Sequence, residues 1–362
     1  MLPLHKNAQQ WKANCEHPNP GLKYDKYIDV WSDDFKKKDK TPFCREFANG
    51  IGDYPSVLLK DYRERRHKLL RSLNGKVLRA RTSWRFVSGL GASHALETGF
   101  VWHRTLGVPY LPGASVKGMV RAWLVHWLGG VEELGSKRAQ LRAAELFGDS
   151  ETEGMGRISL FDAVPETVPR LEIDIMNPHY SKYYADPKRN PPGDYYSPVP
   201  ISFLTVAPGQ WFEFALAPAN SRCTADDLAD GVQLLQDALA FIGCGAKTAV
   251  GYGVFEGFQD RTDEVLDRLR SREEQEILAQ LPPLERKLRE LELALENVAI
   301  SEETKQSTMD LFHDMQDMTD SDKQMVAQTL KAAWIAMGDW EGKLSKKQVK
   351  KVKEVKRLLG EA

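Results

Sequence analysis

The chain has 362 residues, of which 42% are hydrophobic, and a formal net charge of −1. This length can bury a sizeable core, as one elaborated domain with an extension or as two domains. No run of about 18 apolar residues predicts a membrane span, and the polar opening residues do not resemble a signal peptide, so we expect a cytoplasmic protein. The four cysteines are scattered without a CxxC pair, which favours reduced thiols and no metal site or cofactor.

Charge is distributed unevenly along the chain. Between Lys60 and Arg85 there are ten lysines and arginines but two acids. Acids predominate over residues 260–322, and the C-terminus from Lys343 to Arg357 is again basic. The near-neutral total therefore conceals two candidate surfaces for a polyanion.

Residues 1–58 lack clear periodicity, and we expect an irregular, partly helical region over 1–75. Alternation over residues 76–87 then predicts a half-buried strand. One side of this strand is apolar (Leu78, Ala80, Trp84, Phe86), and the other carries the three arginines Arg79, Arg81 and Arg85. A second strand is predicted over 100–104. A Pro-Gly turn follows and leads into a helix with a broad apolar stripe from Val116 to Leu128.

The second half contains further strands and a helical extension. Residues 165–200, rich in Pro, Tyr and Asn, predict a projecting insertion, and the runs 199–206 and 210–217 predict a hairpin around Pro208-Gly209. A helix is expected from Thr224 to Gly243. After Phe258 we expect a separate unit of helices near 262–280, 284–297, 301–316, 321–337 and 345–359.

The first candidate binding motif is the turn and helix start that contains Gly113, Ser115, Lys117 and Arg121. Free N–H groups at a helix N-terminus favour a phosphate, and the two cations would add contacts to the same backbone. A capped amphipathic helix with solvated cations explains the same pattern. Taken alone, the periodicity favours that second interpretation.

The second candidate motif is a glycine-rich loop, GCGAKTAVGYGVF, that leads directly into a strand. Its members of interest are Gly243, Gly245, Lys247, Thr248, Gly251 and Tyr252. Glycines permit positive φ and close approach of a ligand backbone, and the loop matches neither a Walker A motif nor a dinucleotide fingerprint. A tight connection in which glycines serve only packing is an equally good interpretation of this motif alone.

Together, PGASVKGMVR and GCGAKTAVGYGVF resemble the RAMP superfamily of CRISPR systems. The strings FVSGLGASHALETGFVWHRTLGVPYLPG and DIMNPHYSKYY resemble, within it, the family of sixth subunits of the type III-B Cmr effector complex. The resemblance implies an α+β, ferredoxin-like (RRM-related) core over 76–258, with 1–75 before it and an all-helical extension over 259–362. It also implies a non-catalytic subunit that binds guide RNA near its 3′ end, with target RNA and other RAMP subunits as further partners.

The implied RNA contacts are the residues of both motifs and, independently, the arginine face of the first strand. In the insertion, His179 and Tyr180 could stack on or wedge between bases, although a tyrosine-packed turn explains them almost as well. An endoribonuclease that uses His94 and His103 without a metal is one alternative. A helical scaffold without RNA contact is the other.

Overall fold

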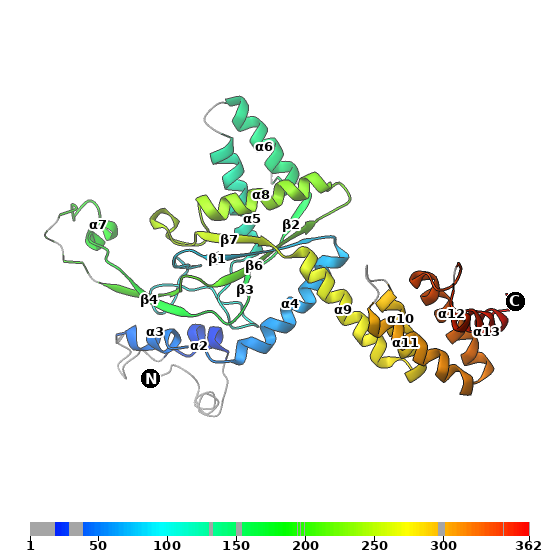
Figure 1. The fold of residues 1–362 in the computed structure, drawn as a ribbon. Helices are drawn as coiled ribbons and strands as arrows, with labels where there is room; N and C mark the ends of the chain where they lie inside the picture. Colours follow the sequence, from blue (N-terminus) through cyan, green and yellow to red (C-terminus); the bar gives the residue numbers. More distant parts are fainter. Residues whose placement is uncertain are drawn as a thin grey trace. The chain divides into compact units, whose positions relative to one another are not determined.

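The computed structural model describes residues 19–28, 39–129, 133–149, 154–193, 195, 197–198, 200–295, 301–342 and 344–361. The chain divides into two compact units, Met1–Asp267 and Arg268–Ala362 (Figure 1). Helix α9 (Thr262–Gln280) contains the point of division. No helix within the described ranges is long and apolar enough to cross a membrane.

An antiparallel sheet forms the centre of the first unit. Its described strands are β1 (Lys76–Thr82), β2 (Ile158–Leu160), β6 (Trp211–Pro218) and β7 (Phe255–Asp260), in the order β2-β6-β1-β7, and β3 (Val164–Pro165) also pairs with β6. The predicted first strand is confirmed, but it ends at Thr82 and not at Val87. Trp84, expected on the apolar side, is 47% exposed because it lies beyond the end of the strand.

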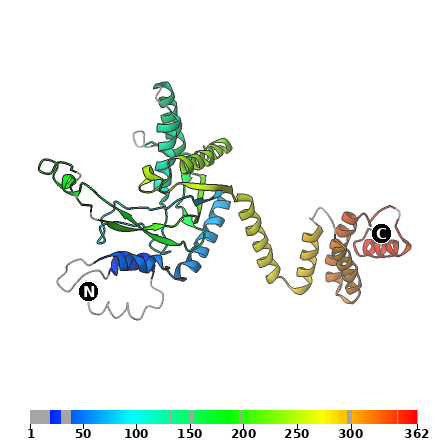
Figure 2. The same ribbon diagram turned by 60° about the vertical axis from the view of Figure 1, so that its left-hand side comes forward.

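Helices cover both faces of this sheet (Figures 1 and 2). On one face α5 (Gly113–Ala122) and α8 (Ala225–Phe241) pack over the buried side chains of Leu78, Phe212 and Phe214. The Thr224 side chain accepts a hydrogen bond from the Asp227 N–H, and the Asp227 carboxylate accepts one from the Thr224 N–H. This capping box confirms the predicted start of α8.

The stripe predicted from Val116 to Leu128 is only partly buried. After Ala122 the chain continues as a π-helical segment, Trp123–Leu128, and then as α6 (Glu133–Phe147). A π-helical turn holds more residues than an α-helical turn, so the apolar periodicity loses its phase there. Trp127 and Leu128 are consequently 63% and 54% exposed, contrary to the prediction.

The opposite face of the sheet carries α4 (Tyr54–Ser72), and a buried ion cluster joins the two. Glu213 of β6 is 1% exposed and pairs with Arg63, Arg66 and His67 at 2.8, 2.5 and 2.9 Å. Burial alone would raise the pKa of Glu213, but these partners hold it well below its usual range. The basic run that begins at Lys60 thus serves partly to hold α4 on the sheet.

The predicted hairpin of residues 199–206 with 210–217 is wrong. β5 (Ile201–Val206) pairs instead with β4 (Leu171–Met176), whereas β6 pairs with β1. Thr82 separates the two runs: its hydroxyl donates to the Ala207 carbonyl and accepts from the Gln210 N–H. The Pro208-Gly209 turn therefore passes across the end of β1. The connection from β4 to β5 carries α7 (Ser181–Ala185) and projects from the unit (Figures 1 and 2).

The strand predicted over residues 100–104 is also wrong. This segment has only an isolated bridge between Trp102 and Pro109, around a turn at Gly107. Its aromatic side chains pack on Tyr24 of α2 (Pro20–Lys26) and Phe47 of α3 (Thr41–Ala48), and not on a neighbouring strand. The apolar pattern there reflects helix contacts.

The second unit is helical, as predicted. It contains the C-terminal part of α9, then α10 (Pro283–Leu295), α11 (Glu302–Asp314), η3 (Met315–Asp317), α12 (Asp320–Met337) and α13 (Lys346–Leu358). Ser301, Thr319 and Ser345 cap three of these helices through their hydroxyls. Trp334 and Leu330 are fully buried at the centre of its own core.

Candidate nucleic-acid interface

The two predicted motifs meet in one pocket of about 400 Å³. The start of α5 contributes Ser115, and the glycine-rich loop contributes Gly243, Gly245 and Thr248. A third segment, 88–91, completes the wall with Ser88 and three neighbours. Stretches more than 120 residues apart in the chain therefore converge. Among the described residues, no lysine or arginine lines this pocket, which offers hydroxyls, main-chain groups and apolar atoms.

Gly113 is required by close packing at the start of α5. A Cβ atom there would lie 2.5 Å from the Leu160 carbonyl oxygen. The Gly113 N–H donates to the Asp162 carboxylate at 2.6 Å, so this donor is already occupied. Gly113 is therefore a packing residue that positions Ser115, and Asp162 is a helix cap that the sequence motif alone does not reveal.

The glycines of the loop divide into two kinds. Gly243, Gly245 and Gly253 have positive φ, and a Cβ at Gly245 or Gly253 would overlap the carbonyl oxygen of Val87 or of Cys244. Gly251 has φ +90° but open space around it. The first kind lets main chain pack against main chain. Gly251 alone leaves room for a ligand to approach.

Lys247 stands at the apex of the loop with φ +61°, an uncommon conformation for a residue with a side chain. Its ammonium lies 5.4 Å from the ring centre of Phe203 and 5.6 Å from that of Tyr252. The Tyr252 hydroxyl bonds to Asp174 of β4. Burial and this carboxylate raise the pKa of Tyr252 to about 12, so the phenol stays protonated and donates. The loop is thereby tied to the β4–β5 pair.

The arginines of the first strand are engaged within the protein. Arg79 stacks on Trp211 at 4.5 Å and pairs with Glu166 at 3.4 Å. Arg81 pairs with Glu256 at 2.9 Å, and Arg85 with Glu172 at 3.2 Å. Arg81 is the most accessible of the three, with 48% of its side chain exposed. These pairings reduce the charge that the strand can offer to RNA.

Lys117 and Arg121 lie on α5 outside the pocket. Lys117 is exposed and follows Ser115 by two residues, whereas Arg121 donates to the Gly148 carbonyl at 2.6 Å. Arg121 lines a separate groove of about 770 Å³ between α5 and α6, together with His126 and Lys137. Arg121 is thus held by a hydrogen bond within the protein, and Lys117 is the cation of this motif that remains exposed at the surface.

His179 and Tyr180 lie on the β4–β5 connection, immediately before α7. His179 is exposed, and the two ring centres are 6.3 Å apart. Neither lines the pocket of the two motifs, so the structure does not bring them together with Ser115 there. Their contact with bases remains a prediction for the projecting element.

His94 and His103 line one groove of about 800 Å³ with Arg104, but both rings are held by main-chain bonds. The His94 Nδ1 accepts from the Leu96 N–H at 3.2 Å, and its ring stacks on Tyr24. The His103 Nδ1 accepts from the Leu106 N–H at 3.3 Å, and burial lowers the pKa of His103. This geometry suits packed histidines better than a pair of proton-transfer groups.

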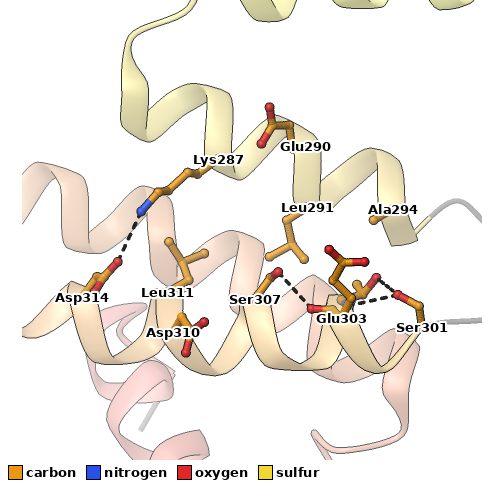
Figure 3. A pocket seen from close by; sticks show the side chains of 11 residues that line it. Lys287, Glu290, Leu291, Ala294, Ser301, Glu303, Ser307, Asp310, Leu311 and Asp314 are labelled. Atoms are coloured by element: carbon orange, nitrogen blue, oxygen red, sulfur yellow. Dashed lines mark hydrogen bonds and ion pairs between the residues drawn. The ribbon is translucent and has the colours of Figure 1, made fainter.

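A further groove of about 540 Å³ lies between α10 and α11 of the second unit (Figure 3). Four carboxylates line it: Glu290, Glu303, Asp310 and Asp314. Its one cation, Lys287, pairs with Asp314 at 3.5 Å. This groove therefore repels phosphate. Neither here nor elsewhere among the described residues is there a group of three or more His, Cys, Asp or Glu side chains that could hold a metal ion.

Sequence reasoning missed one exposed aromatic cluster beside the pocket. The Trp123 ring lies parallel to that of Phe241, with centres 5.3 Å apart, and 5.9 Å from that of Trp127. Phe241 and Trp127 are 71% and 63% exposed. The signal in the sequence was Phe241, two residues before the glycine-rich loop, which reads as part of the apolar end of a helix.

The model of the RAMP superfamily matches residues 74–256, just over half of the chain. The CRISPR system Cmr subunit Cmr6 of Pyrococcus furiosus is 32% identical over 250 residues, which cover 54% of this chain and 72% of that protein. The chain belongs to the RAMP superfamily and, within it, to the Cmr6 family. A Cmr6 relative from Saccharolobus solfataricus is 27% identical over 264 residues, which cover 69% of this chain and 82% of that protein.

Two solved structures are also similar to this Cmr6-family chain. One is a chain of the type III-B Cmr-beta complex bound to cognate target RNA, which is 25% identical. The match covers 70% of this chain and 87% of that chain, with a TM-score of 0.44. The other is Cmr6 from Pyrococcus furiosus, which is 30% identical. The match covers 51% of this chain and 98% of that chain, with a TM-score of 0.33. Both TM-scores are below 0.5, so the family assignment rests on the sequence matches.

Proposed function

We propose that this chain is a non-catalytic, guide-RNA-binding subunit of a type III-B CRISPR effector complex. Membership of the Cmr6 family supports a place in such a complex. The family resemblance implies a position near the 3′ end of the guide. The observation that carries the RNA-binding role is the pocket that joins Ser115 to Gly243, Gly245 and Thr248. Its hydroxyls and main-chain groups suit ribose and phosphate, which position a nucleic acid without reading its sequence. Other RAMP subunits are the expected protein partners.

We also propose that the core is ferredoxin-like. Leaving β3 and the β4–β5 pair aside, the core elements follow one another as β1, α5, β2, β6, α8 and β7. The strand order β2-β6-β1-β7, with antiparallel neighbours throughout and both helices on one face, supports this topology. In it the loop after α8 and the start of α5 lie next to each other, which accounts for the shared pocket.

The test is RNA binding by the full chain with Lys117→Gln and Lys247→Gln combined. These cations flank the pocket, and each lost phosphate contact should weaken binding about five-fold near 0.1 M salt, with a shallower salt dependence. Lys60→Gln with Lys68→Gln is the matched control, because both lysines are exposed on α4 and the charge change is equal. Equal affinities for the two double variants would favour the scaffold alternative.

The absence of catalysis is tested separately. The wild-type chain should leave a labelled RNA intact in the presence of a chelator, because both histidines are committed to main-chain bonds and aromatic packing. Cleavage that disappears with His94→Gln or His103→Gln would instead establish the endoribonuclease alternative.

A further inference from the structure

Helix α13 of the second unit has two chemically different faces. Gln348, Val352 and Val355 are buried in the core of the unit. The exposed face carries cations at intervals of four, three and four residues: Lys346, Lys350, Lys353 and Arg357. Residues with this spacing lie on one side of an α-helix, and at about 1.5 Å per residue the stripe is about 17 Å long.

The four cations of this stripe have no ion pair within the described part of the chain. Of the other three lysines of the helix, Lys347 is also exposed. The other two turn inward: Lys351 lies over the Phe312 ring at 5.3 Å, and Lys356 over the Trp340 ring at 5.2 Å. Glu354 is the one acid of the helix, and it accepts a hydrogen bond from Gln316 at 2.8 Å. The stripe is therefore uncompensated positive charge.

This arrangement opposes the stability of the helix. The first turn contains Lys346 and Lys347 and no acid, although the positive end of the helix dipole is located there. Like charges four residues apart also repel, as in the pair Lys346 and Lys350. In contrast, the first turns of α11 and α12 carry acids. The cations of the exposed stripe thus serve something other than folding.

A polynucleotide backbone fits the stripe better than a protein surface does. Protein interfaces are depleted in lysine, whereas spaced lysines contact successive phosphates independently of sequence. The acidic groove between α10 and α11 repels phosphate, whereas the stripe of α13 attracts it. We propose that α13 is a second phosphate-binding surface that contacts RNA outside the pocket of the first unit. The choice of RNA as the polyanion rests on the proposed function.

The experiment compares two full-chain variants with equal charge changes. The first carries Lys346→Gln, Lys350→Gln, Lys353→Gln and Arg357→Gln, and the control carries Lys287→Gln, Arg289→Gln, Lys305→Gln and Lys323→Gln in the same unit. Binding to a labelled single-stranded RNA of mixed sequence is measured over a series of KCl concentrations. The α13 variant should bind at least about ten-fold more weakly near 0.1 M salt, and its salt slope should fall by about 0.7 per lost contact.

Thermal unfolding of each variant shows whether a loss of RNA affinity comes from a folding defect. The α13 variant should melt no lower than the wild type, since its substitutions remove repulsion. If its RNA affinity and salt slope equal those of the control variant, the proposal is overturned. Loss of affinity for duplex DNA but not for RNA, or loss of an acidic protein partner with RNA affinity intact, would overturn it as well. The Lys117 and Lys247 variant, measured in parallel, reports on the first unit alone.

Discussion

Replacing Gly245 and Gly251 by alanine should separate the packing role of the glycine-rich loop from its binding role. Both have strongly positive φ, +87° and +90°, so each substitution costs about 1–2 kcal/mol of backbone strain. At Gly245 the new Cβ would also overlap the Val87 carbonyl oxygen and lie 2.9 Å from the Phe86 ring. This overpacking adds about 1–3 kcal/mol. At Gly251 there is no atom within 4 Å to meet.

Urea denaturation of the full chain measures the two free energies of unfolding, and hydrogen exchange localises the effect. The Ala246 N–H, which bonds to the Val87 carbonyl at 2.8 Å, should exchange faster in Gly245→Ala only. Gly251→Ala should instead weaken RNA binding about ten-fold, because its methyl group occupies the open side of the loop. If Gly245→Ala were no more destabilising than Gly251→Ala, the close-packing argument would fail.

Three further outcomes follow from single side chains. Glu213→Gln should lower the free energy of unfolding by about 3–5 kcal/mol in urea denaturation, because it leaves buried cations without a countercharge. The exposed ion pair between Glu256 and Arg81 contributes at most about 1 kcal/mol, so Glu256→Gln is the control. The pKa of Glu213 is lower in the folded state than in the unfolded state, where it is about 4.3. Its ion pairs therefore stabilise the fold fully above about pH 4.3, and this stabilisation is lost as the pH falls through the folded-state pKa. The stability difference between the wild type and Glu213→Gln should shrink over the same pH range in melts. Gly118→Ala, at an open helical position, should raise stability by about 1 kcal/mol in the same assay.

The helices of the second unit could be predicted closely from the sequence. The expected ranges 262–280 and 345–359 correspond to α9 (Thr262–Gln280) and α13 (Lys346–Leu358). Helical hydrogen bonds join residues four apart, and caps such as Ser345 lie next to the helix they begin. All the information needed is therefore local. The expected domain limits, in contrast, remain a prediction.

Strand partners could not be predicted in the same way. Alternation marked β5 and β6 correctly as strands, but short separation suggested that they pair with each other. The decisive contact is made by Thr82, more than 120 residues earlier, whose hydroxyl bonds to both ends of the intervening turn. A neighbour that distant in the chain leaves no trace in the local pattern.

The same limit applies to the charges of the candidate site. The sequence shows that Arg79, Arg81 and Arg85 share a face, which suggests a surface free to bind phosphate. It does not show that acids from three other segments neutralise that face. The meeting of the two motifs was predictable because a known family pairs them. The contribution of Ser88 to the pocket wall could not be predicted, since residues 88–91 form no regular helix or strand.

Under the proposed function, the chemistry of the pocket predicts contact with RNA that does not depend on its sequence. A wall of hydroxyls, main-chain groups and apolar atoms contains no charged fork that could read the edge of a base. Lys247 is held against two aromatic rings, so its charge acts from a fixed position beside the pocket. Fixed, sequence-independent contacts orient a strand without selecting it. The proposed guide-RNA-binding subunit would therefore accept any guide, and the choice of target would belong to base pairing.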